Sequence, residues 1–210
     1  MEGGTKNPRF FESVHEMAKR DGIDPYEAMA RRILEMMTEA GISLTDENLA
    51  DGAGTRVFNP GVPEFLAFLN SHGVENFLLS SGLKAYLEHL SIAPEFAEIY
   101  ATTLTHDEDH KITGVWRVMT PEEKAVALGE IASQVNGDAE DFTGIVYVGD
   151  GPTDLTAMEH IKAHGGGAIF IQHDEGNPDL PEARDLDVDF VTGPNYSDGG
   201  ELANYMRRML

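Results

Sequence analysis

Residues 146–154, which read VYVGDGPTD, form the stretch of sequence that decides the fold. The run that leads to Gly149 is short and apolar, as in a buried strand, and the glycines on either side of Asp150 let the chain turn sharply. Pro152 stands where a helix can begin, with Asp154 in its first turn. The stretch therefore predicts a strand, a tight turn and a helix, with two carboxylates at the carboxyl end of the strand.

On both sides of this stretch, strand patterns alternate with helix patterns. Residues 120–123, Thr-Pro-Glu-Glu, predict the start of a helix that carries Lys124. This alternation predicts an α/β fold with a parallel, doubly wound sheet, in which residues 77–79 and 145–148 are parallel strands of one sheet. The other predicted helices cover residues 63–69, 152–163 and 200–210, and a further helix follows Gly82 and runs to about Leu90. The predicted strands cover residues 76–79, 99–104, 112–118, 144–148, 168–171 and 188–191.

The first third of the chain has a different pattern, which is helical throughout. Asp24 and Pro25 predict a helix start, apolar residues then recur at helical spacing, and Gly41 ends the run. Further helices are predicted over residues 9–19 and from Thr45 onward. This region therefore lacks the strands that the rest of the chain shows.

A domain boundary is predicted between these two parts, because residues 52–60 are rich in glycine and proline. The predicted division is a helical region at residues 1–56 and an α/β core at residues 57–210. The first ten residues are polar and lack the apolar stretch of a secretory signal.

The composition excludes several classes of function. The chain has 37 acidic and 15 basic residues, a formal net charge of −22, which would repel nucleic acids and anionic membrane surfaces. It has no cysteine, which excludes disulfides, zinc–thiolate sites and thiol nucleophiles. No apolar run is long enough to cross a membrane. We therefore expect a cytoplasmic protein that binds neither nucleic acid nor membrane.

Three groups of polar residues are candidates for a binding site, because ligands of such sheets bind at the carboxyl ends of the strands. Asp150 and Asp154 offer hard carboxylate oxygens suited to Mg²⁺, although a turn residue and a helix-start charge would show the same pattern. Ser80, Ser81 and Gly82 follow another apolar run and could hold phosphate oxygens.

Taken alone, this serine–glycine turn is more typical of a helix cap than of a phosphate site. Lys124 could bind phosphoryl oxygens as a point charge, although exposed helical lysines are common. For Asp150 and Asp154 the functional interpretation is the stronger one, because an apolar strand runs directly into residues 149–154.

Together these groups resemble the motifs of the haloacid dehalogenase superfamily, from about Val57 to the C-terminus. Residues 77–80 are similar to its phosphate-binding serine motif, Lys124 to its basic third motif and residues 146–154 to its acidic, magnesium-binding motif. Residues 58–62 are similar to its entry into the second core strand. The helical first third resembles the small cap of phosphoserine-phosphatase-like members.

The resemblance implies a Rossmann-like parallel sheet of this type beneath an N-terminal helical cap, and a Mg²⁺-dependent phosphomonoester hydrolase that acts on a small phosphorylated substrate. It implies that Asp150 anchors Mg²⁺ and that Asp154 is a further ligand or lies just behind one. It also implies that Ser80, with Ser81 as its rival, and Gly82 bind the phosphoryl group, whose charge Lys124 neutralises.

The first motif of the family, an apolar strand followed by Asp-x-Asp, has no counterpart near the N-terminus. Asp-x-Asp occurs only at Asp107/Asp109, Asp185/Asp187 and Asp187/Asp189. Asp107 and Asp109 lie in a polar turn, and we interpret Asp187 and Asp189 as residues flanking a late edge strand. We therefore expect the first core strand to be absent and this chain, as a truncated form, to be inactive for lack of the aspartate nucleophile.

Two other interpretations stay open from the sequence. A degenerate module could keep the metal and phosphate sites without turnover. An unrelated flavodoxin-like or receiver-like domain is disfavoured, because a receiver carries its acidic pair in its first half, which is helical here. The candidate substrate contacts of the cap are Arg9, Lys19, Arg20, Arg31 and Arg32, but each is more typical of a solvated helix face.

Overall fold

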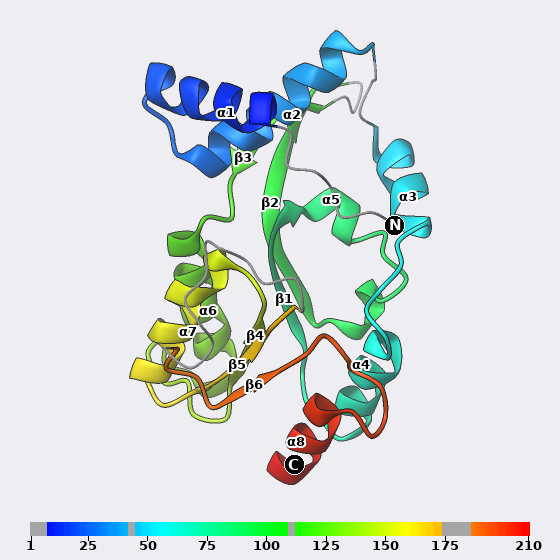
Figure 1. The fold of residues 1–210 in the computed structure, drawn as a ribbon, viewed down its shortest axis with the longest axis vertical. Helices are drawn as coiled ribbons and strands as arrows, with labels where there is room; N and C mark the ends of the chain where they lie inside the picture. Colours follow the sequence, from blue (N-terminus) through cyan, green and yellow to red (C-terminus); the bar gives the residue numbers. More distant parts are fainter. Residues whose placement is uncertain (1–7, 42–44, 109–111, 174–185) are drawn as a thin grey trace. The chain divides into compact units, whose positions relative to one another are not determined.

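The computed structural model describes residues 8–41, 45–108, 112–173 and 186–210 (Figure 1). The chain divides into two compact units. The first unit comprises Met1–Thr55, Ser80–Ser91 and Ala101–Met119, and the second comprises Arg56–Leu79, Ile92–Tyr100 and Thr120–Leu210. The predicted division at residues 56 and 57 stays a prediction. Two later segments, Ser80–Ser91 and Ala101–Met119, belong to the first unit.

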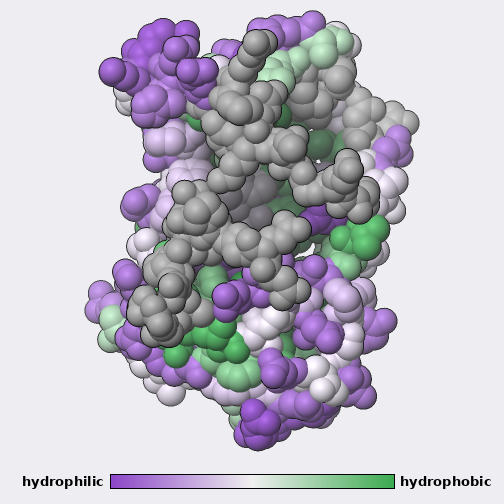
Figure 2. Space-filling model, in the orientation of Figure 1, coloured by the Kyte–Doolittle hydropathy of each residue, from purple (hydrophilic) through white to green (hydrophobic). Residues whose placement is uncertain are grey.

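The N-terminal part of the first unit is helical, as predicted. It contains α1 (Pro8–Asp21), α2 (Pro25–Glu39) and α3 (Asp46–Gly54), and the Asp24 side chain caps α2 by accepting from two backbone amides. Helices α1 and α2 pack on each other through Val14, Met17, Ala18 and Ala28. Hydrophilic residues cover the outer side of α1, as Figure 2 shows.

Strands β1 (Phe77–Leu83), β2 (Glu98–His106) and β3 (Ile112–Arg117) form a sheet in that order. Strands β2 and β3 pair antiparallel, with Leu104 opposite Val115. The strands predicted at residues 99–104 and 112–118 are thus confirmed, and the structure adds that they are neighbours. Two short helical segments, α5 (Lys84–Leu87) and η1 (Ala93–Glu95), lie between β1 and β2.

A parallel sheet lies at the centre of the second unit. Strands β4 (Val146–Gly149), β5 (Gly167–Ile171) and β6 (Phe190–Thr192) pair in parallel in that order. The predicted α/β class with a parallel sheet is confirmed. The α-helices in the described part of this unit are α4 (Val62–Ser71), α6 (Pro121–Asn136), α7 (Pro152–Ala163) and α8 (Glu201–Met209).

The central strand β5 is buried on both faces, because successive side chains of a strand point to opposite sides. Ala168 and Phe170 pack in a core with residues of α6 and α7. Ile169 and Ile171 pack in a second core with residues of α4 and α8. The second unit therefore has the layered architecture expected of helices on both faces of a parallel sheet.

One expectation about the sheet is wrong. The runs at residues 77–79 and 145–148 do not belong to one sheet, because β1 and β4 lie in separate three-stranded sheets. Among the described residues, β4 pairs only with β5, and its Val148 is 38% exposed. The physical reason is that, within the described ranges, no strand pairs with both β1 and β4, so no ladder of hydrogen bonds joins the two sheets there.

The end of β1 is also corrected. The sequence suggested that the strand stops at Ser80 and that a helix then runs to about Leu90, but β1 continues to Leu83 and α5 is a single turn. A contact with β2 holds the extension in place, since the Thr102 side chain donates a hydrogen bond to the Ser81 backbone carbonyl at 3.0 Å. None of the helices in the described ranges is long and apolar enough to span a membrane.

Candidate functional site

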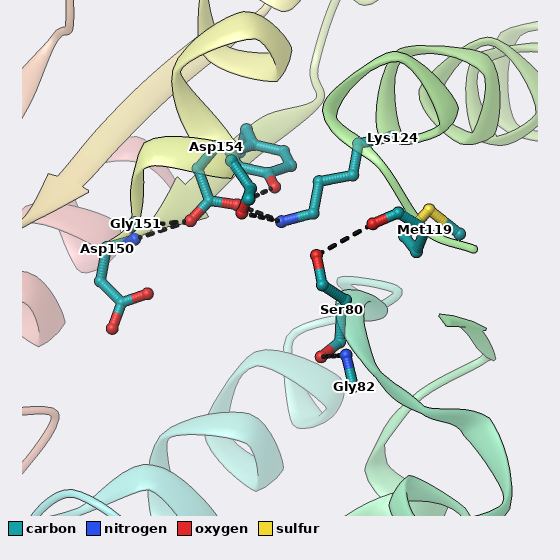
Figure 3. Close-up of polar contacts among 10 residues, drawn as sticks. Ser80, Gly82, Met119, Lys124, Asp150, Gly151 and Asp154 are labelled. Carbon is teal, nitrogen blue, oxygen red and sulfur yellow. Dashed lines mark hydrogen bonds and ion pairs between the residues drawn. The ribbon is translucent and has the colours of Figure 1, made fainter. Parts of the chain in front are cut away.

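The turn between β4 and α7 brings Asp154 back under the end of the strand. The Asp154 Oδ2 atom accepts hydrogen bonds from the backbone amides of Asp150, at 3.1 Å, and Gly151, at 2.9 Å (Figure 3). A Cβ atom at Gly149 would lie 2.6 Å from the Asp154 Cγ, so only glycine allows this close approach. The sequence of the turn therefore fixes the Asp154 carboxylate inside the protein.

The other oxygen of Asp154 meets two side chains. Its Oδ1 accepts from the Lys124 Nζ at 2.6 Å and from the Tyr147 hydroxyl at 2.7 Å. Lys124 also donates to the Thr153 Oγ1 at 3.0 Å. Lys124 and Asp154 are only 3% and 6% exposed. The pair is therefore a buried ion pair whose carboxylate accepts four hydrogen bonds.

This arrangement changes the acidity of its members. Burial by itself would raise the pKa of Asp154, but the Lys124 ammonium and the hydrogen bonds from Lys124, Tyr147 and Gly151 hold it below its ordinary value. Burial, and then the adjacent Asp154 carboxylate, raise the pKa of the Tyr147 phenol far above its usual range. Asp154 is therefore ionised and Tyr147 neutral at physiological pH.

Asp150 has a different environment, although it is only four residues away. Its carboxylate points away from Asp154 in Figure 3, and its side chain is 60% exposed. Its Oδ2 lies 2.9 Å from the Nε2 of His173, which follows β5. Burial, and then the charge of Asp150, raise the pKa of Tyr196 to about 12. Asp150 thus presents an accessible carboxylate at the carboxyl end of β4.

Ser80, Ser81 and Gly82 belong to the first unit and lie within β1 rather than after it. The Ser81 hydroxyl donates to the Met119 carbonyl at 2.9 Å, so its proton is already used. The Ser80 Oγ accepts from the Gly82 amide at 3.1 Å, which leaves the Ser80 hydroxyl hydrogen for another acceptor. Of the two serines, Ser80 is the better donor, and the Gly82 amide is turned toward Ser80.

The structure thus brings together Lys124, Asp150 and Asp154 within the second unit. That the serines meet this cluster stays a prediction. Within the described ranges, no three acidic or histidine side chains are grouped closely enough to hold a metal ion. An ion bound at Asp150 would therefore need water or further ligands from elsewhere.

The alternative Asp-x-Asp at Asp187 and Asp189 lies at the other end of the sheet. Asp189 Oδ2 accepts from the backbone amide of Ala168, at the start of β5, and its Oδ1 pairs with Lys162 at 2.5 Å. Asp150 instead follows the end of β4. The interpretation of Asp189 as a residue flanking β6 therefore agrees with its contacts, and Asp189 is far from the candidate site along the strands.

A comparison with protein-family models decides the family. Residues 3–159 match the model of the haloacid dehalogenase-like hydrolases. The chain belongs to this family. The match contains Lys124, Asp150 and Asp154, and the predicted resemblance is thereby confirmed. No curated protein sequence shows a significant match.

Solved structures of related fold include a haloacid-dehalogenase-family hydrolase from Salmonella enterica serovar Typhi, with a TM-score of 0.63 at 19% identity over 88% of this chain and 58% of that one. A probable phosphoserine phosphatase from Vibrio cholerae has a TM-score of 0.57 at 21% identity, over 81% of this chain and 48% of that one. A phosphoserine phosphatase in apo form has a TM-score of 0.62 at 18% identity, over 93% and 90%.

The chain therefore spans about half of the first two structures but most of the third. At these identities the similarity concerns the fold, which is that of the haloacid dehalogenase phosphatases.

Two residues of the site were not identified from the sequence. In the sequence, Tyr147 looks like one more apolar residue of a strand. The signal that could have identified its polar contact is its hydroxyl group, seven residues before Asp154. His173 could have been found as a polar residue just after a buried strand, because adjacent parallel strands end at the same edge of a sheet.

Proposed function

We propose that this chain carries the metal- and phosphate-binding part of a Mg²⁺-dependent phosphomonoester hydrolase that acts on a small phosphorylated substrate. The observation that supports this most directly is the buried Lys124–Asp154 pair beside the accessible Asp150 carboxylate, all at the carboxyl end of β4. Phosphoryl transfer depends on such a combination of a cation, a metal-binding carboxylate and precise positioning.

The donor set favours Asp150 as the metal ligand. Mg²⁺ prefers hard oxygen ligands and usually keeps several waters, which an exposed carboxylate at a strand end allows. Asp154 fits this role less well, because both of its oxygens accept hydrogen bonds inside the protein. In this proposal Asp154 holds Lys124 and the residues around Asp150 in place. When bound, the cation would neutralise charge on the phosphoryl oxygens.

Lys124 and Ser80 would bind the phosphoryl group. A lysine ammonium has three donor hydrogens, and Lys124 uses two of them on Thr153 and Asp154. The third remains for a phosphoryl oxygen. The Ser80 hydroxyl keeps its hydrogen for the same purpose, whereas Ser81 does not. A fixed cation in a buried position stabilises transition-state charge without having to reorganise.

The nucleophile is the missing element. The resemblance to the family implies that an aspartate attacks phosphorus to form an aspartyl-phosphate. No Asp-x-Asp of this sequence follows a strand of the described parallel sheet, since Asp107 follows β2, which pairs antiparallel with β3, and Asp189 precedes β6. Strand β4 has an unpaired edge within the described part of the chain. We therefore expect the 210-residue chain alone to be inactive. The second candidate, a degenerate module that binds metal and phosphate without turnover, agrees with the same contacts.

The DNA sequence upstream of Met1 and a phosphatase assay together distinguish the enzyme from the degenerate module. The reading frame ahead of the Met1 codon either encodes an apolar strand ending in Asp-x-Asp or does not. If it does, the extended protein should hydrolyse small phosphomonoesters with Mg²⁺ and lose this activity with a chelator or when the first aspartate becomes Asn. Hydrolysis by the 210-residue chain alone, at about one turnover per second or faster, would show that the nucleophile lies within it.

A further inference from the structure

The pairing of Asp150 with His173 joins the ends of two adjacent parallel strands. Gly149 of β4 lies opposite Phe170 of β5, and each strand is followed by one member of the pair. The His173 Nε2 lies 2.9 Å from the Asp150 Oδ2. An ionised carboxylate can only accept, so the Nε2 atom must carry the hydrogen of this bond.

The backbone on both sides of this pair is anchored. The Asp150 amide donates to the buried Asp154 carboxylate, which in turn binds Lys124. The Gln172 amide, one residue before His173, donates to the Thr192 carbonyl of β6 at 2.8 Å. Because the main chain is held at both positions, only a few side-chain torsions remain to be ordered when the pair forms.

This contact is unsuited to stabilising the fold. The side chains of His173 and Asp150 are 46% and 60% exposed, and exposed pairs contribute little to stability. A hydrogen bond to one oxygen of a carboxylate does, however, fix the orientation of the whole group. With Oδ2 held by the imidazole, Oδ1 is the oxygen of Asp150 that is offered to a cation.

We propose that His173 is a positioning residue for the metal-binding carboxylate of Asp150. This inference rests on the proposed function, because it takes Asp150 as the ligand. Groups that hydrogen-bond to metal ligands typically change metal affinity by about 10–100-fold when they are removed. His173 acts in this way through its N–H group and not as a ligand itself.

The test measures binding of Mn²⁺ alone, a spectroscopic substitute for Mg²⁺ that takes the same oxygen ligands. Electron paramagnetic resonance would follow the loss of the free-ion signal in the 210-residue protein and its variants. We expect His173→Ala to weaken binding about tenfold or more. His173→Gln should recover most of this loss, because the glutamine amide can place an N–H near the position of Nε2.

Two controls complete the experiment. Asp150→Ala should abolish binding, and His89→Ala, which removes an exposed imidazole in the other unit, should leave it unchanged. Thermal unfolding should give the same midpoint for His173→Ala as for the unaltered protein, so that the loss cannot come from unfolding.

The outcomes separate the two proposals. Wild-type affinity in His173→Ala, together with loss of binding in Asp150→Ala, would overturn the role of His173 alone. If His173→Gln failed to recover binding while affinity for Zn²⁺ fell more than that for Mn²⁺, His173 would be a direct ligand and the positioning role would be wrong. No saturable binding, or equal binding by Asp150→Ala, would instead overturn the metal site itself.

Discussion

Asp150 and Asp154 lie four residues apart in one turn, yet their surroundings differ in every respect. Asp154 is 6% exposed and accepts four hydrogen bonds, two from side chains that reach it from α6 and β4. Asp150 has a side chain that is 60% exposed and contacts the imidazole of His173. A buried, saturated carboxylate can organise a site but has little capacity left for a ligand, whereas the exposed one can bind.

The largest difference between the two carboxylates should appear in stability. Asp154→Ala leaves the Lys124 ammonium buried without its counter-charge, which typically costs about 3–5 kcal/mol of unfolding free energy. Urea unfolding monitored by circular dichroism would measure the loss. A change below about 1 kcal/mol would mean that water reaches Lys124 and that the pair is not buried in solution.

A smaller effect is expected for Tyr147→Phe. The variant keeps the buried ring but removes the hydroxyl that donates to Asp154 at 2.7 Å. Hydrogen bonds to charged groups contribute about 1.5–3 kcal/mol, so the same unfolding experiment should show a loss in this range. A matched control is Tyr100→Phe, which removes a hydroxyl that contacts an exposed Glu98 carboxylate and should change stability much less.

The difference in unfolding free energy between the unaltered protein and Asp154→Asn should depend on pH. Because the pKa of Asp154 is lowered in the folded protein, its stabilisation is fully present above the pKa of the unfolded chain, near 3.9, and is lost as the pH falls through the lower folded value. Unfolding free energies of the two proteins should therefore converge below about pH 4. A difference that stayed constant down to the acid-unfolding region would contradict the lowered pKa.

The smallest change in stability is expected for Asp150→Ala. Its exposed side chain makes a surface contact with His173, and such pairs contribute about 0–1 kcal/mol. The backbone amide that binds Asp154 is retained in the variant. Unfolding curves that match those of the unaltered protein, together with lost Mn²⁺ binding, would support a binding role for Asp150. A large destabilisation would show that this carboxylate is structural as well.

Much of the fold could be predicted because it depends on local chemistry. The apolar run to Gly149 favours a strand, the flanking glycines permit a sharp turn and Pro152 favours a helix start, and β4 and α7 form where these residues indicate. Thr120 caps α6 through the Glu123 amide, as its position before a proline suggested. These signals lie within a few residues of the structure they specify, so one sequence is sufficient to interpret them.

The arrangement of the site was decided only by tertiary structure. Lys124 and Asp154 are 30 residues apart, and their ion pair depends on how α6 packs against α7. Tyr147 looks apolar in sequence, and its role follows from the position of its hydroxyl group beside a buried charge. The extension of β1 through Ser80 and Ser81 likewise follows from bonds that β2 and Met119 make with it. Such contacts depend on distances between elements, which no local pattern encodes.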